Sequence, residues 1–184
     1  MNAYISPVTL YSAAAKIIGD KTPLRIDCGR LCKNACCAVE EEITGMYLFP
    51  RERLRYIPVP GWAHIYETDF EYKTDCFARL FTCNGSCARR RRPLACMIFP
   101  LVPYAHRGDK LQIIMDPRGR GMCPLARAMK IGDLDGEFTS AVRRAMTLLM
   151  TNSECREFIY RLTEILDEEL PQQAIAAAFR KYKK

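Results

Sequence analysis

The feature that most constrains the fold of this chain is a dense group of cysteines. Four of them lie within the ten residues from Cys28 to Cys37, and four more follow between residues 83 and 123. Thiolates are soft ligands that suit zinc and iron–sulfur clusters, and one short loop can present several of them at bonding distance. The sequence therefore predicts a small fold built around a metal centre. The expected ligands are Cys28, Cys32, Cys36, Cys37, Cys83, Cys87, Cys96 and Cys123.

The cell compartment decides what so many cysteines can do. The first ten residues lack a basic start followed by an apolar stretch, and no run of about 18 apolar residues occurs. We therefore expect no secretory signal and no membrane span, and the expected location is the cytoplasm, where reducing conditions keep thiols free. Adjacent cysteines such as Cys36 and Cys37 also make a poor disulfide pair. Disulfides and buried, inert thiols remain as the alternatives to metal binding.

Composition and charge narrow the class of protein. The chain has 184 residues, of which 49% are hydrophobic and 27% charged, as in a globular domain with a core. The net charge of +7 comes mainly from Arg89–Arg92 and from residues 180–184. Cations beside a thiolate centre offset its negative charge, and no aromatic-rich RNA-binding signature occurs. Nucleic acid is therefore not the expected partner.

The N-terminal segment has the signals of one helix. Ser6 is a good cap and Pro7 suits the first helical position. Apolar residues then recur at helical spacing, and Gly19 can end the helix. These features predict a helix over residues 7–18.

Several short stretches in the middle of the chain are typical of strands. Residues 46–49 suit a short strand that ends at a proline. Residues 62–66 and 70–73 are expected to pair with each other. Residues 101–105 and 111–115 flank a turn, which predicts a β-hairpin.

The C-terminal part is expected to be helical, because apolar residues recur there with the helical period. The expected helices cover residues 124–130, 138–150 and 153–169, and Pro171 is expected to open a last one. The predicted fold class is therefore α+β, with a small cysteine-rich metal-binding core of short strands followed by a helical C-terminal portion. The natural division is a cysteine-cluster portion, 1–130, and a helical extension packed on it, 131–184.

The eight expected ligands suit two arrangements. They can form two four-thiolate sites, or one larger cluster with thiols to spare. Cys76 is a further possible ligand, or a small buried hydrophobe. Cys155 lies at a predicted helix start, away from the other cysteines, and is expected to be structural.

Other side chains offer weaker candidates. The two histidines, His64 and His106, are expected to face solvent or to form hydrogen bonds rather than to bind metal. Asp116 and Glu52 are candidates for residues that hydrogen-bond to a metal ligand, or for ligands of a hard metal. Each can equally be a turn or helix-surface residue. No catalytic residues are identified, because no Ser/His/Asp arrangement and no phosphate-binding glycine loop occurs.

These motifs resemble the YkgJ-type cysteine-cluster family, which is described as zinc- or iron-chelating. The resemblance covers about residues 24–125, with the pieces in the expected order. The matching pieces are Cys28-x3-Cys32…Cys36-Cys37, Thr44-Gly-Met-Tyr-Leu-Phe-Pro50, Cys83-Asn-Gly-Ser-Cys87, Arg92-Pro-Leu-Ala-Cys96 with Phe99-Pro100, and Asp116…Cys123-Pro124. A looser likeness, to the three-cysteine loop of radical S-adenosylmethionine enzymes, is set aside because those enzymes need a barrel longer than this chain.

The chain departs from the family pattern at two points. Three residues, rather than the usual two, separate Cys32 from the cysteine pair, which leaves open which of Cys36 and Cys37 is a ligand. Met97 stands where the family commonly has an arginine after the cysteine.

The resemblance implies a bound metal but no general reaction. Some members of the family are similar to flagellin lysine N-methylase, which implies a protein or peptide substrate as one possibility. We therefore expect a cytoplasmic protein that holds an iron–sulfur cluster or zinc through two groups of cysteines, with redox or group-transfer activity. Compact spacing and nearby arginines favour iron–sulfur. The alternatives are a zinc-stabilised structural or protein-binding module and a protein- or peptide-modifying enzyme. The sequence does not indicate an oligomeric state.

Overall fold

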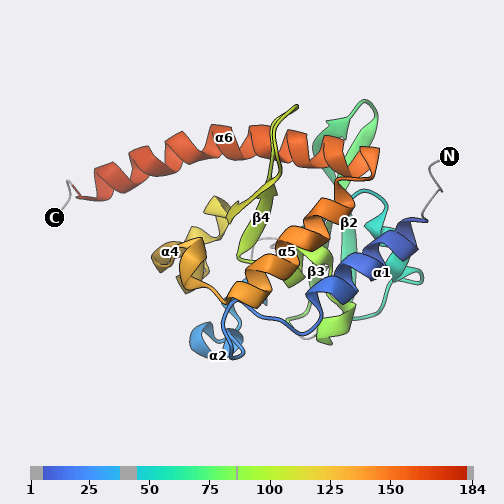
Figure 1. Cartoon of the computed structure of the whole chain (residues 1–184), viewed down its shortest axis with the longest axis horizontal. Coiled ribbons are helices and arrows are strands. Elements are labelled where there is room, and N and C mark those ends of the chain that lie inside the picture. The colour runs from blue at the N-terminus through green and yellow to red at the C-terminus, as the bar shows by residue number, and fades with distance from the viewer. Residues whose placement is uncertain (1–5, 38–44, 86, 182–184) are drawn as a thin grey trace.

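The structure of the protein is a computed structural model that describes residues 6–37, 45–85 and 87–181, with side chains up to residue 168. Helices and antiparallel strands both occur, which confirms the predicted α+β class. Figure 1 shows a long helix along one edge, two diagonal helices side by side, and the strands behind them. None of the helices in this part of the chain has the length and apolar character that a membrane span would need.

The first helix forms where the sequence predicts it. In α1 (Pro7–Ile18), the side-chain oxygen of Ser6 accepts a hydrogen bond from the backbone N–H of Thr9. Gly19 ends the helix with a φ of 58°, a left-handed conformation that glycine adopts without steric cost. The buried face of α1 packs on α5 (Gly136–Leu149), its diagonal neighbour in Figure 1.

A three-stranded antiparallel sheet has its longest pairing between consecutive strands. The central strand, β3 (Cys76–Cys83), lies between β1 (Met46–Leu48) and β2 (Ala63–Lys73). Ala63 pairs with Cys83, at the end of the sheet where the second set of cysteines begins. The sheet therefore fixes the starting point of the Cys83 loop.

The expected pairing of residues 62–66 with 70–73 is wrong, because both stretches belong to β2. The residues between them form no turn. Instead, the hydroxyl of Thr68 donates to the carbonyl of Ala78 on β3 at 2.8 Å, within an irregularity of the β2–β3 register. The chain turns later, where Asp75 adopts a positive φ of 57°.

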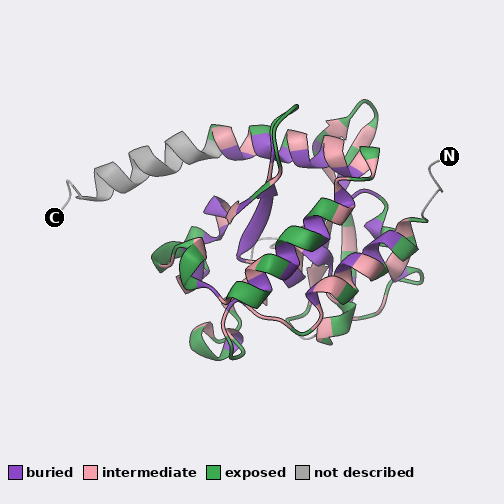
Figure 2. Cartoon of the chain, in the orientation of Figure 1, coloured by how far each residue is buried: buried purple, intermediate pink, exposed green. Residues whose placement is uncertain are grey.

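The second sheet is the predicted hairpin. It consists of β4 (Leu101–Tyr104) and β5 (Gln112–Met115), with Leu101 opposite Met115. Figure 2 shows that β4 is mostly buried, because it lies against the long helix α6 (Ser153–Lys181).

The C-terminal helices are confirmed except for the last boundary. α4 (Pro124–Ala128) and α5 lie where helices are predicted, and the side chain of Asp135 caps α5 by accepting from the N–H of Phe138 at 2.9 Å. The prediction that Pro171 opens a separate helix is wrong, because α6 continues through it. One proline removes a single backbone hydrogen bond, and its glutamate, leucine, glutamine and alanine neighbours favour helix.

One hydrophobic core joins early and late parts of the chain. Tyr11 of α1 lies in it with Ile98, Phe138 of α5 and Phe158 of α6, all nearly inaccessible to solvent. The boundary at residue 130 stays a prediction.

The remaining elements are short helical turns, and most of them lie beside cysteines. They are α2 (Gly29–Cys32), η1 (Ala35–Cys37), η2 (Glu52–Tyr56), η3 (Arg89–Arg91), α3 (Leu94–Ile98), η4 (Pro117–Gly121) and η5 (Ile131–Asp133).

Candidate metal centre

The eight cysteines that are expected to bind metal come from four separate segments. These are the α2–η1 stretch, the end of β3 with the turn after it, α3, and the residue before α4. All eight are free thiols; Cys123 is buried and the other seven are half-buried. The fold brings these segments together around two adjoining pockets.

The first of these, which we name the Cys28 pocket, lies between α2 and the start of α4. Its thiols are those of Cys28, Cys32, Cys36, Cys96 and Cys123, and Arg89 and Arg92 also line it. Cys28 packs on the small apolar cluster formed by Cys123, Leu125 and Ala126. This contact joins the first cysteine of the chain to the last of the eight.

The second, which we name the Cys83 pocket, lies at the end of the three-stranded sheet. Its thiols are those of Cys36, Cys37, Cys83, Cys87 and Cys96, and Arg92 lines it too. Gly85, two residues after Cys83, has a φ of 82°. A Cβ on Gly85 would lie 3.0 Å from the carbonyl oxygen of Cys37, so the backbone at Gly85 approaches η1 closely at Cys37.

The two pockets adjoin, because Cys36, Cys96 and Arg92 line both. The Sγ atoms of Cys36 and Cys37 lie 3.9 Å apart in hydrogen-bonding contact. Over residues 6–37, 45–85 and 87–181, no three histidine, cysteine, aspartate or glutamate side chains are arranged to hold a metal ion as they stand. Thiols are donors that suit a soft metal. To bind one here, the cysteine side chains would have to turn toward a common centre.

Burial opposes ionisation of several of these thiols. It raises the pKa of Cys96 well above the ordinary value, and neighbouring thiols raise it further. Burial is also the first cause of the raised pKa values of Cys28 and Cys83. A thiol in such surroundings becomes a thiolate most readily when a cation binds beside it.

The pKa values of the two adjacent thiols, Cys36 and Cys37, are shifted in opposite directions. The hydrogen bond between the thiols, followed by burial, raises the pKa of Cys36. The same hydrogen bond lowers the pKa of Cys37 to about 6, against burial and with help from the charge of Arg92. One thiolate of this pair is therefore stabilised by the hydrogen bond from the other thiol.

Two half-buried arginines supply positive charge at the pockets. The Nε atoms of Arg89 and Arg92 are buried, and neither has a hydrogen-bond partner among the described residues. Burial lowers the pKa of Arg92, but a hydrogen bond with Cys87 and the nearby thiols outweigh it and raise the pKa overall. A buried N–H donor that faces a group of thiols suits an anionic sulfur centre.

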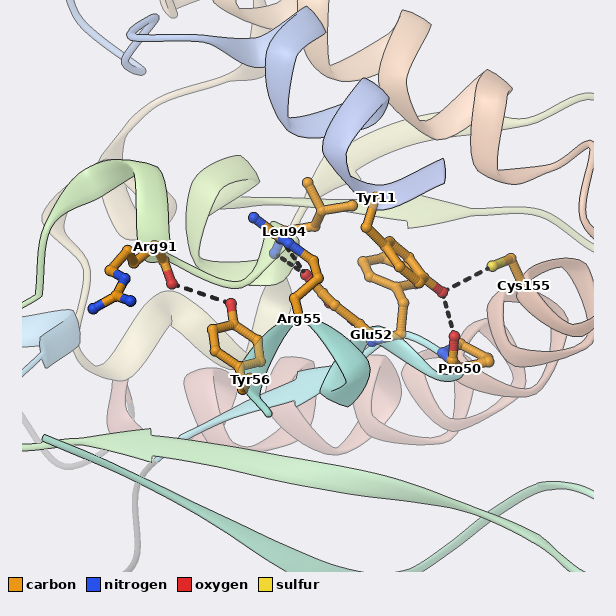
Figure 3. A network of polar contacts seen from close by, with 9 residues as sticks. Tyr11, Pro50, Glu52, Arg55, Tyr56, Arg91, Leu94 and Cys155 are labelled. Carbon is orange, nitrogen blue, oxygen red and sulfur yellow. Dashed lines mark hydrogen bonds and ion pairs between the residues drawn. The ribbon is translucent and has the colours of Figure 1, made fainter. Parts of the chain in front are cut away.

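A polar network behind the Cys83 pocket holds α3 in place (Figure 3). The side chain of Glu52, which is completely buried, accepts hydrogen bonds from the N–H of Leu94 at 2.8 Å and of Phe49 at 3.2 Å. Arg55 donates to the same carboxylate at 3.1 Å. Leu94 is the first residue of α3, which carries Cys96, so Glu52 positions this candidate ligand.

The same region is held by two tyrosines (Figure 3). The hydroxyl of Tyr56 donates to the carbonyl of Arg91 at 3.1 Å, which anchors the arginine turn η3. The hydroxyl of Tyr11 donates to the carbonyl of Pro50 and lies 3.3 Å from the Sγ of Cys155. Cys155 is buried in α6, outside both pockets, in agreement with its predicted structural role.

The other candidates lie elsewhere. Cys76 begins β3 and lines neither pocket. His64 and His106 are exposed, as expected, and the Nε2 of His106 lies 3.2 Å from the hydroxyl of Tyr104. Asp116 is buried, but its carboxylate binds the side chain of Arg118 in a bidentate ion pair.

A mainly apolar cavity of about 520 Å³ has Cys36 in its wall. It lies among β1, α3, β4 and α6, and Cys36 lines it together with Phe49, Phe99 and Leu162. Asp116 and Arg118 add the charged groups to its wall. A small molecule or side chain placed there would lie beside Cys36, which also lines both cysteine pockets.

The sequence indicated Glu52 as a possible ligand, a partner of a ligand or a helix-surface residue, and it did not predict the hydrogen bond to Leu94. No local pattern points to this contact, although the position of Glu52 three residues after Phe49 could have suggested its bond to the Phe49 N–H. Thr44 and Ser86, which belong to the family-like motifs, lie outside the described residues.

Comparison of this chain with family models, with curated proteins and with solved structures finds no match. The resemblance to the cysteine-cluster family therefore stays a prediction, as does the role of the eight cysteines as ligands.

Proposed function

We propose that this protein is a cytoplasmic metal-binding protein that holds an iron–sulfur cluster or zinc through two groups of cysteines. The observation that supports the proposal most is the meeting of cysteines from four separate segments around two adjoining pockets. Thiols collect in this way for ligation more readily than for packing, since any small apolar residue would serve packing equally well.

The charge at the pockets favours iron–sulfur. Arg92 lines both pockets and Arg89 lines the Cys28 pocket, and their buried Nε–H groups lack a hydrogen-bond partner among the described residues, which leaves them available as donors to a sulfur-rich anion. A cluster would supply electron transfer at this site, and zinc would supply a structural link or a Lewis acid. The function is therefore redox or group transfer if iron–sulfur is bound.

The direct test is oxygen-free purification, followed by a visible spectrum and by counting iron, zinc and acid-labile sulfide on one sample. Brown protein with iron and sulfide in similar amounts would support the cluster. Colourless protein with stoichiometric zinc and no sulfide would support a zinc protein instead. Folded protein that takes up neither metal would overturn the proposal.

A second candidate is an enzyme that modifies a protein or peptide, as the family resemblance implies. The observation that favours it is the apolar cavity beside Cys36, which is large enough for a substrate side chain. A ligand-by-ligand Cys→Ser series separates it from a structural zinc module. In a structural module, metal loss and unfolding occur together in every variant. An enzyme allows at least one substitution that keeps the fold and abolishes activity.

A further inference from the structure

We propose that the eight cysteines form two separate four-thiolate centres, and that the boundary between them runs between the adjacent residues Cys36 and Cys37. This inference rests on the proposed function, because it assumes that the cysteines bind metal. The first centre consists of Cys28, Cys32, Cys36 and Cys123. The second centre consists of Cys37, Cys83, Cys87 and Cys96.

Backbone contacts place Cys37 with the second centre. The backbone at Gly85 comes so close to Cys37 that a Cβ on Gly85 would lie 3.0 Å from the Cys37 carbonyl oxygen. The nearby thiols that raise the pKa of Cys83 are those of Cys87 and Cys37. Cys37 lines the Cys83 pocket together with Cys83 and Cys87, and it does not line the Cys28 pocket.

Cys36 and Cys96 line both pockets, whereas three thiols line each pocket alone, so each four-thiolate centre takes one of these two. The surroundings of Cys96 agree with the second centre. The thiols that act on it most strongly are those of Cys37, Cys83 and Cys87. Its helix α3 begins at Leu94, which Glu52 holds by a 2.8 Å hydrogen bond. Cys96 therefore completes the second centre as its fourth thiol.

Packing places the other four cysteines together. Cys28 packs against the buried cluster of Cys123. After burial, the nearby thiols of Cys32 and Cys123 are the next causes of its raised pKa. Cys36 lines both pockets, and it belongs to the same short α2–η1 stretch as Cys28 and Cys32, so it joins their centre. These contacts give the first centre its four thiols.

The division also satisfies the chemistry of both metals. Four thiolates close a tetrahedral zinc site, and four cysteines also hold one iron–sulfur cluster. Arg92 lines both pockets, so its single charge faces both centres. In this arrangement both members of the adjacent pair are ligands, each of a different centre.

The test compares single and double Cys→Ser variants by metal content. Each protein is purified without oxygen, its iron and zinc per chain are measured, and its fold is checked by circular dichroism. Cys36→Ser and Cys37→Ser should each lose half of the wild-type metal. Cys28→Ser combined with Cys36→Ser should lose no more than Cys36→Ser alone, because both act on one centre. Cys83→Ser combined with Cys36→Ser should lose all of it.

A matched control is Cys76→Ser, which removes a half-buried thiol that lines neither pocket and should keep the full metal content. Where a variant does not fold, the wild type is partly stripped with a chelator and alkylated, and the modified cysteines are identified by mass spectrometry. The thiols should then become reactive in the two sets of four named above.

Two results would overturn the division while leaving metal binding intact. One is an equal loss from the same-centre and cross-centre double variants. The other is alkylation of Cys36 and Cys37 with the same set, or of all eight thiols in one step. A wild type that holds no metal would instead overturn the proposed function itself.

Discussion

The carboxylate of Glu52 accepts a hydrogen bond from the backbone N–H of Leu94 at 2.8 Å, two residues before Cys96. Glu52 is completely buried, and it also accepts from the N–H of Phe49 and from Arg55. Three donors around one carboxylate leave it a single position, so the start of α3 is fixed from behind. The position of Cys96 thus depends on a residue that lies 44 positions earlier in the sequence.

Replacing Glu52 by alanine should destabilise the protein strongly. The N–H groups of Leu94 and Phe49 would lose their acceptor inside the core, and each buried unsatisfied donor costs about 1–3 kcal/mol. Glu52→Ala should therefore lower the free energy of unfolding by about 3 kcal/mol or more in denaturant titrations.

The matched control is Glu67→Ala, whose side chain is 84% exposed and pairs with Arg79. An exposed ion pair of this kind is worth about 0–1 kcal/mol, so the control should change stability little. Equal stability losses in the two variants would contradict the positioning role of Glu52.

Replacing Arg92 by glutamine should weaken metal retention. Arg92 lines both cysteine pockets, so Arg92→Gln removes one charge beside the thiols. A loss of about 1 kcal/mol corresponds to roughly fivefold weaker binding, measured as transfer of metal to a competing chelator. Arg90→Gln is the control, because Arg90 is an exposed member of the same run. If both variants release metal alike, net charge rather than the position of Arg92 is responsible.

Gly85→Ala should affect the second centre selectively. A side chain at a φ of 82° is strained, and its Cβ would press on the carbonyl of Cys37 at 3.0 Å. Gly108→Ala is matched in strain, since Gly108 has a φ of 88° but open space around its Cβ position. Both variants should lose about 1–2 kcal/mol of stability, and only Gly85→Ala should lose metal. Full metal retention in Gly85→Ala would argue against the close approach of the backbone at Gly85 to Cys37.

The cap of α5 should give a pH dependence at acid pH. The hydrogen bond from the Phe138 N–H, with further help from Arg25, lowers the pKa of Asp135 below its ordinary value of 3.8. A carboxyl whose pKa is lower in the folded protein stabilises it above the unfolded pKa, and this contribution disappears as the pH falls through the folded pKa. Asp135→Asn keeps a good cap without the charge. The stability difference between wild type and Asp135→Asn should be constant above about pH 5 and shrink below pH 4, as measured by thermal unfolding. A stability difference that grows toward acid pH would contradict a lowered pKa of Asp135 in the folded protein.

Local sequence signals predicted most of the helices and the second hairpin, because capping residues and periodicity are local properties. Ser6 and Gly19 marked both ends of α1. The pairing of β2 with β3 was missed because residues 62–66 and 70–73 were expected to be two separate strands, whereas the hydroxyl of Thr68 between them bonds across the sheet to Ala78. Pro171 looked like a helix boundary, but it lies within α6.

The candidate site was predictable only as a list of residues. Cysteine spacing indicated which thiols belong to it, since a short segment such as 28–37 must bring its own cysteines close together. Their grouping depends on contacts between distant segments, such as Cys28 with the Cys123 cluster and Gly85 with Cys37. Spacing along the chain carries no information on such contacts.

The most direct measurement is X-ray absorption at the edge of the metal bound to protein purified without oxygen. Thiolate ligation predicts a first shell made of sulfur alone, about 2.3 Å from the metal, with four sulfur neighbours per metal atom. The shell should be unchanged in Cys76→Ser. A first shell that contains nitrogen or oxygen from histidine or carboxylate ligands would contradict thiolate centres, and with them the assignment of the eight cysteines.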